Sequence, residues 1–339
     1  MIKVAAAGGG TGGHLYPLLA ILETLAKRVD VKVLFFAVKG KIDERVVRKD
    51  HPEFETVSID VRGLLRPLHH PKNLWRTLKI GIATIEVKKH LKRFKPDLVV
   101  LTGGYISGVV GLAAKDLGIP IFVHEQNVVP GLAVKVLSQY AKKVFVSFER
   151  TRDYLREWQD KIVVTGCPVR ETEKEAPLKD FVLVLGGSLG SEAINELMEK
   201  VYPELQETQF VHSTGSDDWT ERLSVFPNVT ALTYIDPMGA YWKKAIASIS
   251  RAGASTIAEM MYYGVPGILI PWESSAESHQ LENALEAERL GYGIVIRENE
   301  ASPRKIIESI DKVVKKGKIE KMKENPASKI SEEILGEIM

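Results

Sequence analysis

Short apolar segments alternate with longer segments of helical periodicity along the whole chain. In the first half, the apolar segments have the length of strands and are apolar on successive residues, so both faces of each strand would be buried. Strands of this kind, separated by helices, are typical of a parallel sheet covered by helices on both faces. We predict strands at residues 2–7, 31–37, 98–102, 120–124 and 143–147, and helices at residues 17–29, 73–93, 107–117 and 131–139.

The second half of the chain repeats this alternation, and a charged segment separates the halves. Residues 170–179 contain a proline and lack apolar periodicity, so they are predicted to form a linker. The expected domains are residues 1–170 and 171–325, and the first domain is a candidate packing surface for an amphipathic C-terminal helix within residues 326–339. The later predicted strands are 181–185, 209–213, 247–249, 267–270 and 293–296, and the later helices are 192–202, 255–262, 278–290 and 303–315.

Composition limits the class of protein. The chain has 339 residues, of which 45% are hydrophobic and 27% charged, as in a globular protein of about two domains. Cys167 is the single cysteine, which excludes an intramolecular disulfide and any multi-cysteine metal site and fits a reducing cytoplasm. The net charge of +2 does not require a nucleic-acid partner. No apolar run approaches the ~20 residues that span a bilayer, and the amino terminus has the pattern of a strand and not of a signal peptide.

Three glycine-rich loops follow predicted strands and precede predicted helices. They are GGGTGG at residues 8–13, GGYISG at 103–108 and GGSLG at 186–190. Ligands of open α/β sheets bind at such strand-to-helix turns, where backbone N–H groups and the helix dipole attract a phosphate. A tight turn needed only for packing is the alternative for each loop. The sequence therefore predicts phosphate-bearing ligands in each half.

Two common nucleotide-binding classes fit the loops poorly. GxxxxGK[ST] is absent, which disfavours a P-loop NTPase. Gly8, Gly10 and Gly13 match the GxGxxG of a dinucleotide-binding fold, but no carboxylate stands at the end of the second strand, residues 35–39, to bind the ribose. The missing carboxylate therefore disfavours an NAD-dependent oxidoreductase.

An ordered set of motifs resembles the MurG family of glycosyltransferases, which act in bacterial cell-wall synthesis. The set is GGTGGH at residues 9–14, GGYISG at 103–108, HEQN at 124–127, GCPVR at 166–170, GGS at 186–188 and RAGASTIAE at 251–259. The resemblance implies a GT-B fold, with two Rossmann-like parallel-sheet domains facing a central cleft. It also implies inverting transfer of N-acetylglucosamine (GlcNAc) from UDP-GlcNAc to the 4-hydroxyl of N-acetylmuramic acid in lipid I, which forms lipid II at the cytoplasmic face of the plasma membrane.

Departure of UDP requires stabilisation of a growing diphosphate charge. No Asp-x-Asp metal motif occurs, so we expect no metal and no cofactor. Fixed dipoles and a cation are the alternative: the N–H groups at Gly187 and Ser188, the helix start at residues 254–256, and Arg170. A linker arginine and a helix-capping serine are the structural alternatives for Arg170 and Ser188.

The resemblance assigns further donor contacts residue by residue. Glu259 would accept the ribose hydroxyls, unless it is a solvated helix carboxylate, and Ile235 would offer backbone groups to uracil, unless it is a plain strand residue. His279, Leu189 and Cys167 depart from the family pattern, which affects the direct sugar contacts and not the nucleotide site. The donor contacts expected are Thr11, Gly12, Gly13, Asn127, Arg170, Ser188, Ile235, Ala254, Ser255, Thr256, Glu259 and Gln280.

A base must remove the proton of the attacking hydroxyl. His14 is the first candidate because imidazole titrates near working pH, and helix capping or phosphate contact is its alternative. Glu125 is the second candidate, with support of its loop as the alternative. The loops around Gly10, Gly104, Tyr105 and Ser107 are expected to hold the acceptor pyrophosphate.

A basic, amphipathic segment gives a route to the lipid. Residues 72–95 contain eight basic residues against Glu86 alone, and Leu74, Trp75, Leu78, Ile82 and Ile85 recur there at helical spacing. Such a helix can lie on an anionic leaflet, or it can be an ordinary packed helix. Residues 64–68 offer a second apolar contact. We therefore expect peripheral attachment to the anionic inner-leaflet surface of the membrane. Other cell-wall enzymes are a second class of candidate partners, although no motif identifies one.

Three alternatives to this function stay open besides the oxidoreductase. A related GT-B enzyme could glycosylate another lipid, such as diacylglycerol. A UDP-GlcNAc 2-epimerase shares the fold but needs a carboxylate and histidine set that cannot be placed in this sequence. A non-enzymatic nucleotide-sugar sensor would show the same binding motifs.

Overall fold

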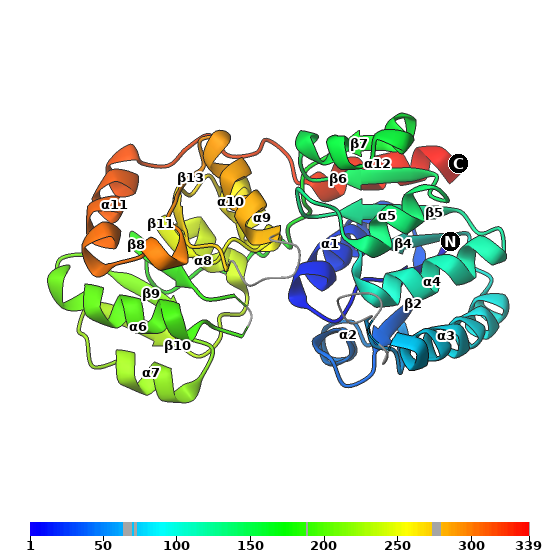
Figure 1. The fold of residues 1–339 in the computed structure, drawn as a ribbon, viewed down its shortest axis with the longest axis horizontal. Helices are drawn as coiled ribbons and strands as arrows, with labels where there is room; N and C mark the ends of the chain where they lie inside the picture. The colour runs from blue at the N-terminus through cyan, green and yellow to red at the C-terminus, as the bar shows by residue number, and fades with distance from the viewer. Residues whose placement is uncertain (64–69, 71–72, 188, 273–278, 339) are drawn as a thin grey trace. The chain divides into compact units, whose positions relative to one another are not determined.

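The chain forms two compact units, each built on a parallel sheet with helices packed against it (Figure 1). The first unit comprises Met1–Val169 and Asn325–Met339, and the second comprises Arg170–Glu324. The structure is a computed structural model that describes all residues except 64–69, 71–72, 188, 273–278 and 339. Ser188 and the apolar loop at 64–68 lie outside the described residues.

The sheet of the first unit has seven parallel strands in the order β3-β2-β1-β4-β5-β6-β7. The strands are β1 (Ile2–Ala7), β2 (Val31–Val38), β3 (Glu55–Ile59), β4 (Leu98–Leu101), β5 (Ile121–Glu125), β6 (Lys143–Val146) and β7 (Ile162–Val164). The helices are α1 (Gly12–Arg28), α2 (Ile42–Asp50), α3 (Asn73–Phe94), α4 (Gly104–Asp116), α5 (Leu132–Ser138) and α12 (Pro326–Ile338), with 3-10 turns at Glu149–Tyr154 and Arg156–Lys161.

The second unit repeats the design with six parallel strands in the order β10-β9-β8-β11-β12-β13. The strands are β8 (Phe181–Leu185), β9 (Phe210–Ser213), β10 (Val229–Leu232), β11 (Ala245–Ser250), β12 (Gly267–Leu269) and β13 (Gly293–Val295). The helices are α6 (Glu192–Val201), α7 (Asp217–Leu223), α8 (Met238–Lys244), α9 (Ala254–Tyr263), α10 (His279–Arg289) and α11 (Pro303–Lys316), with 3-10 turns at Tyr202–Glu204 and Glu298–Glu300.

Strand order reverses direction at one place in each sheet, between β1 and β4 and between β8 and β11. Ligands of doubly wound sheets bind beyond the carboxyl ends of the strands at this switch point. Ala7 pairs with Leu101 at the end of the first pair, and Leu185 pairs with Ser250 at the end of the second. The glycine loops that follow Ala7, Leu101 and Leu185 therefore lie at the two switch points.

Alternate side chains of the strands fill two cores in the first unit. Phe36 of β2 packs on the side covered by α3, α4 and α5, whereas Phe35 packs on the side covered by α1 and α12. Ile330 and Ile334 of α12 are fully buried in that second core. In the second unit, α6 and α11 cover one face of the sheet.

The predicted two-sheet α/β fold is confirmed, and the predicted inner strands agree with the structure within a few residues. Sequence patterns missed β3, β7 and β10, which lie at sheet edges and contain several partly exposed residues. The predicted start of the first helix at residue 17 was wrong, because α1 begins at Gly12 and contains Pro17 in its interior. His14 therefore lies in the first turn of a helix.

Candidate active site

The first glycine loop is held against the end of β4. A Cβ on Gly8 would lie 1.8 Å from Thr102 Oγ1, and that hydroxyl donates a hydrogen bond to the carbonyl of His14 at 2.7 Å. Only a glycine at residue 8 therefore allows Thr102 to join the loop to the first turn of α1.

Asp43, in the first turn of α2, is a fully buried carboxylate beneath the same loop. It accepts hydrogen bonds from Gly10 N at 3.2 Å and from Val38 N at 2.6 Å. A Cβ on Gly9 would lie 2.1 Å from Asp43 Oδ2. Because Asp43 occupies the Gly10 amide, this geometry favours a supporting role for Gly10 over direct contact with an acceptor phosphate. Sequence reasoning missed Asp43, whose only local signal is an acidic residue in a helix's first turn.

The second glycine loop packs on the imidazole of His14. Gly103 and Gly104 have φ values of +94° and +75°, and a Cβ on Gly103 would lie 3.1 Å from two ring atoms of His14. The hydroxyl of Ser107 is fully buried and contacts the carbonyls of Ala7 and Gly103. Ser107 thus supports the loop from within the protein.

Tyr105, on the first turn of α4, lies beside the first glycine loop. A Cβ on Gly10 would lie 3.4 Å from its ring and hydroxyl. Burial, followed by the negative charge of Asp43, raises the pKa of the Tyr105 hydroxyl, although Arg62 opposes this shift. The tyrosine is therefore a neutral hydrogen-bonding group at the edge of the site.

His14 is held through one ring nitrogen. Its Nδ1 lies 2.8 Å from the carbonyl of Thr102 and 3.0 Å from Gln126 Oε1. Both partners are acceptors, so Nδ1 carries the hydrogen, and in the neutral ring Nε2 has the lone pair that a general base requires.

Glu125, the other candidate base, is buried at the end of β5. Its Oε1 accepts hydrogen bonds from the backbone N of Asn127 at 2.9 Å and from its Nδ2 at 3.0 Å, and its Oε2 accepts one from Gly131 N at 2.9 Å. Donors thus meet both oxygens and fix the turn between β5 and α5. This geometry favours the supporting role for Glu125 and orients the Asn127 amide.

In the second unit, the glycine loop after β8 packs backbone against backbone. A Cβ on Gly190 would lie 2.1 Å from the carbonyl of Thr214, and a Cβ on Gly215 would lie 2.4 Å from the carbonyl of Leu189. Ser191 follows the loop and caps α6, since its hydroxyl accepts from Ile194 N at 3.5 Å. Leu189, a departure from the family pattern, is 88% exposed.

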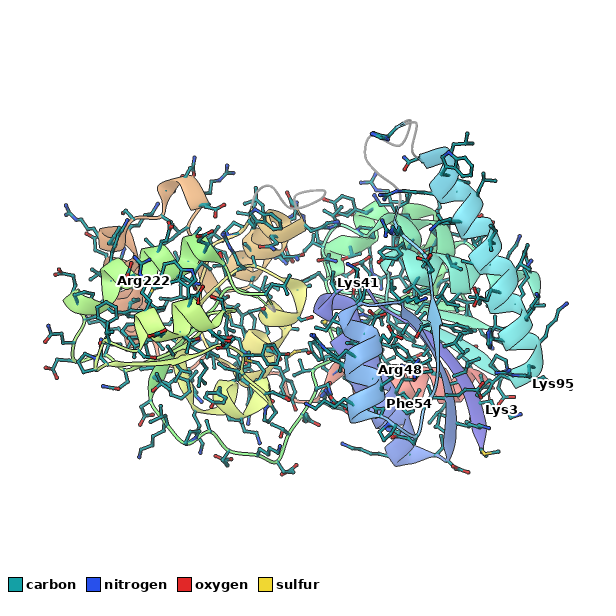
Figure 2. The ribbon with its side chains drawn as sticks, turned by 90° about the horizontal axis from the view of Figure 1, so that it is seen from below. Lys3, Lys41, Arg48, Phe54, Lys95 and Arg222 are labelled. Atoms are coloured by element: carbon teal, nitrogen blue, oxygen red, sulfur yellow. The ribbon has the colours of Figure 1, made fainter. Side chains whose placement is uncertain are left out.

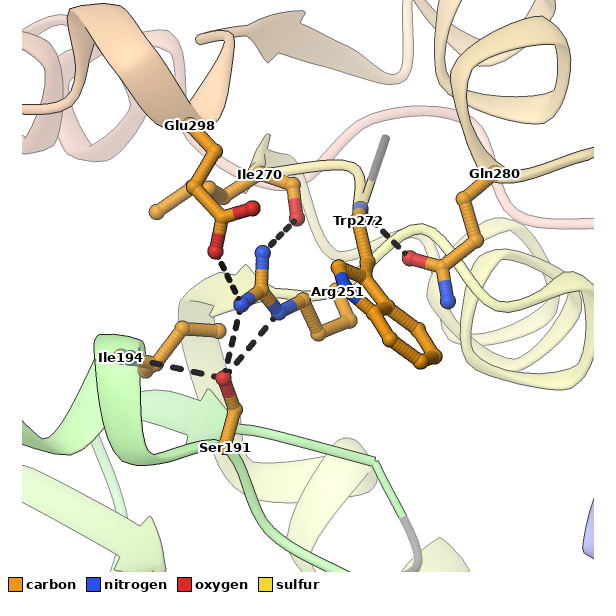
Figure 3. A network of polar contacts seen from close by, with 7 residues as sticks. All are labelled: Ser191, Ile194, Arg251, Ile270, Trp272, Gln280 and Glu298. Carbon is orange, nitrogen blue, oxygen red and sulfur yellow. Dashed lines mark hydrogen bonds and ion pairs between the residues drawn. The ribbon is translucent and has the colours of Figure 1, made fainter. Parts of the chain in front are cut away.

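Arg251 joins this capped helix to the end of β11 (Figure 3). Its Nε and Nη2 donate to Ser191 Oγ at 3.1 and 2.9 Å, and its Nη1 donates to the carbonyl of Ile270 at 3.3 Å. Nη2 also pairs with Glu298 at 2.5 Å. The buried guanidinium therefore anchors the glycine loop at the switch point, a role that the sequence motif did not disclose.

Helix α9 begins at the same switch point. Ala254, Ser255 and Thr256 form its first turn, which contains no acidic side chain. Glu259 lies one turn further and accepts a hydrogen bond from Trp242 Nε1 at 3.0 Å. Burial raises the pKa of Glu259 to about 7, against the lowering effect of the Trp242 hydrogen bond. A carboxylate that titrates near neutral pH thus stands beside the helix start.

The remaining donor residues lie on separate elements. Ile235 is buried, and Gln280 in the first turn of α10 accepts a hydrogen bond from Trp272 N at 2.9 Å. Arg170 is the first residue of the second unit. The buried thiol of Cys167 lies 3.8 Å from the carbonyl of Pro168 and takes part in packing.

Comparison with known proteins identifies both halves of the chain. Residues 4–146 match the glycosyltransferase family 28 N-terminal domain, and residues 181–336 match the glycosyltransferase family 28 C-terminal domain. A Thermotoga maritima enzyme named UDP-N-acetylglucosamine–N-acetylmuramyl-(pentapeptide) pyrophosphoryl-undecaprenol N-acetylglucosamine transferase is 99% identical over 339 residues, covering 100% of both chains. An enzyme of the same name from Lactobacillus johnsonii is 35% identical and matches 92% of this chain and 90% of its own.

Solved structures agree with this assignment. MurG of Acinetobacter baumannii superposes with a TM-score of 0.73 at 27% identity, covering 99% of this chain and 100% of that one. A putative UDP-N-acetylglucosamine 2-epimerase from Listeria monocytogenes has a TM-score of 0.70 at 13% identity, covering 97% of this chain and 94% of that one. The second likeness concerns the fold alone.

Proposed function

The chain belongs to glycosyltransferase family 28, and on that basis we propose that it transfers GlcNAc from UDP-GlcNAc to lipid I and so forms lipid II. The observation that carries this proposal is the 99% identity over 339 residues with the Thermotoga maritima enzyme that bears this activity in its name. The acceptor atom is the 4-hydroxyl of N-acetylmuramic acid.

The donor site of this proposal is the switch point of the second unit. The backbone N–H groups of Gly187 and of the first turn of α9 bind the diphosphate in this proposal, with Arg170 as the cation. Glu259 accepts the ribose hydroxyls, and Ile235 contacts uracil through its backbone. Asn127, Ala254 and Gln280 contact the sugar.

The acceptor site is the switch point of the first unit, with His14 as the base. The 4-hydroxyl oxygen attacks the anomeric carbon, the bond from that carbon to the diphosphate oxygen breaks, and UDP departs with the bonding electrons. The hydroxyl proton passes to His14 Nε2. A single displacement inverts the anomeric centre, so an α-linked donor gives a β-1,4 product.

Attachment to a leaflet through α3 is part of the proposal. None of the helices in the described part of the chain combines the length and the hydrophobicity of a transmembrane helix. Ala83, Val87 and Leu91 of α3 face the core, whereas Leu74 and Trp75 are 71% and 73% exposed. Figure 2 shows the side chains of α3 projecting outward along its length as far as Lys95, just beyond its end. The exposed apolar side chains of α3 form a stripe that comprises Leu74, Trp75, Leu78, Ile82 and Ile85. An exposed apolar stripe on a basic helix suits the surface of an anionic bilayer.

The ion pairs of α3 adjust the electrostatic part of this attachment. Lys79 pairs with Asp60 at 3.3 Å, Lys88 pairs with Asp116, and Arg93 pairs with Glu55 at 2.6 Å. These carboxylates reduce the positive charge that the sequence alone suggests. The apolar stripe therefore supplies a larger share of the expected affinity.

UDP release tests the proposed function. Purified protein is incubated with UDP-GlcNAc, with and without a lipid I analogue, and UDP is measured. Release that depends on the acceptor supports the transferase. Release without acceptor indicates a hydrolase. Binding without release indicates a sensor if the recovered nucleotide sugar is unchanged, and an epimerase if its sugar has been epimerised. A parallel reaction with diacylglycerol separates lipid I from another lipid acceptor.

A further inference from the structure

We propose that Gln126 and His124 are positioning residues that hold His14 in its Nδ1–H tautomer and so keep the Nε2 lone pair for the acceptor hydroxyl. This inference rests on the proposed function insofar as it takes His14 as the base. The tautomer itself is a property of the unliganded protein and is measurable without any substrate.

The ends of the hydrogen-bonded chain have fixed polarity. His14 Nδ1 lies 2.8 Å from the carbonyl of Thr102, and His124 Nε2 lies 3.0 Å from the carbonyl of Gly166. A carbonyl oxygen only accepts, so His14 carries a hydrogen on Nδ1 and His124 carries one on Nε2. In a neutral ring the other nitrogen is then an acceptor, which leaves His124 Nδ1 ready to receive a hydrogen bond.

Gln126 connects these ends in one orientation only. Its Nε2 lies 2.9 Å from the carbonyl of Thr102 and 3.1 Å from His124 Nδ1, so its two hydrogens have acceptors. Its Oε1 then faces His14 Nδ1 at 3.0 Å. Rotating the amide by 180° would set Oε1 against the Thr102 carbonyl and N–H against the N–H of His14. The donor and acceptor roles of the side chains of His14, Gln126 and His124 thus have one consistent assignment.

The surroundings keep this assignment at neutral pH. His124, Gln126 and Thr102 are all buried. Burial lowers the pKa of His124 to about 4, the hydrogen bond to Gly166 opposes that shift, and the charge of a protonated His14 adds to it. His124 therefore stays neutral above that range, and its Nδ1 continues to accept from Gln126.

The consequence for His14 is chemical. The tautomer of a neutral histidine is set by the hydrogen bond that the other nitrogen makes, and a free imidazole prefers the opposite tautomer, with hydrogen on Nε2. If the hydrogen were on Nε2, this nitrogen could only donate a hydrogen bond to the hydroxyl of the acceptor sugar and could not remove its proton. Thr102 and Gln126 together supply two acceptors for Nδ1–H, and His124 keeps Gln126 from turning.

Nitrogen NMR of the full chain tests the tautomer directly. Protein labelled with ¹⁵N-histidine is studied at pH 8, and His14 and His124 are assigned with the His14→Ala and His124→Asn variants. We expect His14 as the Nδ1–H form and His124 as the Nε2–H form. A His14 ring that carries its hydrogen on Nε2 overturns the inference, whatever the activity.

Two substitutions of His124 provide a matched pair. Asparagine places Oδ1 near the position of His124 Nδ1 and still accepts from Gln126, whereas glutamine places an N–H near Nε2 and retains only the Gly166 contact. We expect turnover of H124N to stay within ~3-fold and turnover of H124Q to fall by roughly 10-fold or more, in the range of losses on removing partners that orient a histidine. The KM for UDP-GlcNAc should change less than about 2-fold in both.

Equal losses of turnover in the two variants, with an unchanged His14 spectrum, would show that the residues act only in packing and would overturn the inference. Gln126→Leu gives a second measurement if either variant fails to fold, since it should mix the His14 tautomers. Absence of acceptor-dependent UDP release would instead contradict the proposed function and leave the NMR result standing.

Discussion

Trp242 donates its indole N–H to the carboxyl group of Glu259 at 3.0 Å, which joins α8 to α9 beside the donor switch point. Burial raises the pKa of Glu259 to about 7, so this group is partly protonated at neutral pH in the free protein. Two ribose hydroxyls that donate to a carboxylate prefer its ionised form. The proposed ribose contact would therefore link donor binding to ionisation of Glu259.

Affinity for UDP-GlcNAc should rise with pH between about 6 and 8 and then level off, because protonation of Glu259 competes with donation from the ribose. The Glu259→Gln variant should bind ~10–100-fold more weakly at pH 8 and should lose the pH dependence, since hydrogen bonds to a charged group contribute about 1.5–3 kcal/mol. Calorimetric titration with UDP-GlcNAc at several pH values measures both effects. A variant that retains the wild-type pH profile would exclude Glu259 as its origin.

Replacement of His14 by alanine should lower turnover by at least ~10²-fold, because a general base contributes about that much. Affinity for UDP-GlcNAc should change little, since the role proposed for His14 is to accept the proton of the acceptor hydroxyl and not to bind the donor. Steady-state kinetics with a lipid I analogue and calorimetry with UDP separate the two quantities.

Glu125→Gln is the comparison for this variant. An amide N–H₂ would face the N–H of Gly131, and a buried group left without its partner costs about 1–3 kcal/mol of unfolding free energy. Urea denaturation should therefore show a lower free energy of unfolding for Glu125→Gln. His14→Ala should lower turnover more than it lowers stability. Near-normal turnover of His14→Ala would rule out His14 as the base.

Two glycines of the first loop should respond oppositely to alanine. Gly8→Ala places a Cβ 1.8 Å from Thr102 Oγ1, and it should lower the free energy of unfolding by more than ~2 kcal/mol through overpacking. The Cβ of Gly13→Ala has its nearest neighbour at 3.9 Å, so this variant should be as stable as the parent or gain up to about 1 kcal/mol from helix propensity. Thermal and urea denaturation of both variants test the pair, and equal stabilities would contradict the packing described for Gly8.

Arg251→Lys should loosen the donor loop. A lysine cannot reproduce the forked contacts to Ser191, Glu298 and the Ile270 carbonyl, so the cap of α6 loses its anchor. We expect UDP affinity to fall by roughly 10-fold or more, as for loss of a buried charged hydrogen-bond network of about 1.5–3 kcal/mol. Calorimetric titration with UDP measures the change.

Arg222→Lys is the matched control for that variant. Arg222, labelled in Figure 2, also makes a forked contact, to Glu199, but its side chain is 58% exposed. Exposed ion pairs contribute about 0–1 kcal/mol, so UDP affinity and stability should stay near the parent values. A loss in Arg222→Lys as large as in Arg251→Lys would mean that the buried network has no special role.

The exposed stripe of α3 should govern binding to vesicles. Trp75→Ser combined with Ile82→Ser should lower partitioning onto anionic vesicles at least ~10-fold, because each large apolar side chain contributes about 1.5–3 kcal/mol when buried. Val225→Ser serves as control, since Val225 is also 73% exposed but belongs to the second unit. Sedimentation with vesicles at rising salt measures the electrostatic contribution to binding. Equal binding to neutral and anionic vesicles would show that electrostatic attraction does not contribute.

The inner parts of each sheet could be predicted because strands such as β4 and β8 are buried on both faces and consist of a continuous apolar run. The edge strands β3, β7 and β10 could not, and in β3 the residues Glu55, Thr56 and Ser58 are polar and partly exposed. The edge strand β13 was predicted, because its residues Ile294 and Val295 are apolar. The glycine loops were also predictable, because both a glycine-rich loop and an inner strand are recognised from consecutive residues.

The contacts that shape the site are different in kind. Asp43 meets Gly10 across 33 residues of sequence, and His14 meets Gln126 across 112. Each side chain alone fits a solvated or packed role, and only the strand order of the first sheet brings them together. Motif matching therefore indicated the segments of the candidate site, whereas the contacts of Asp43, Gln126 and Arg251 required the fold.

The return of the chain to its first unit has a consequence for biosynthesis. The core beneath α1 includes Ile330, Ile334 and Leu335, so the first unit remains incomplete until α12 has left the ribosome. All residues of the second unit, 170–324, precede α12 and can pack earlier. The half of the chain that is made first is therefore the half that matures last, and until then α1 exposes the apolar surface that chaperones recognise.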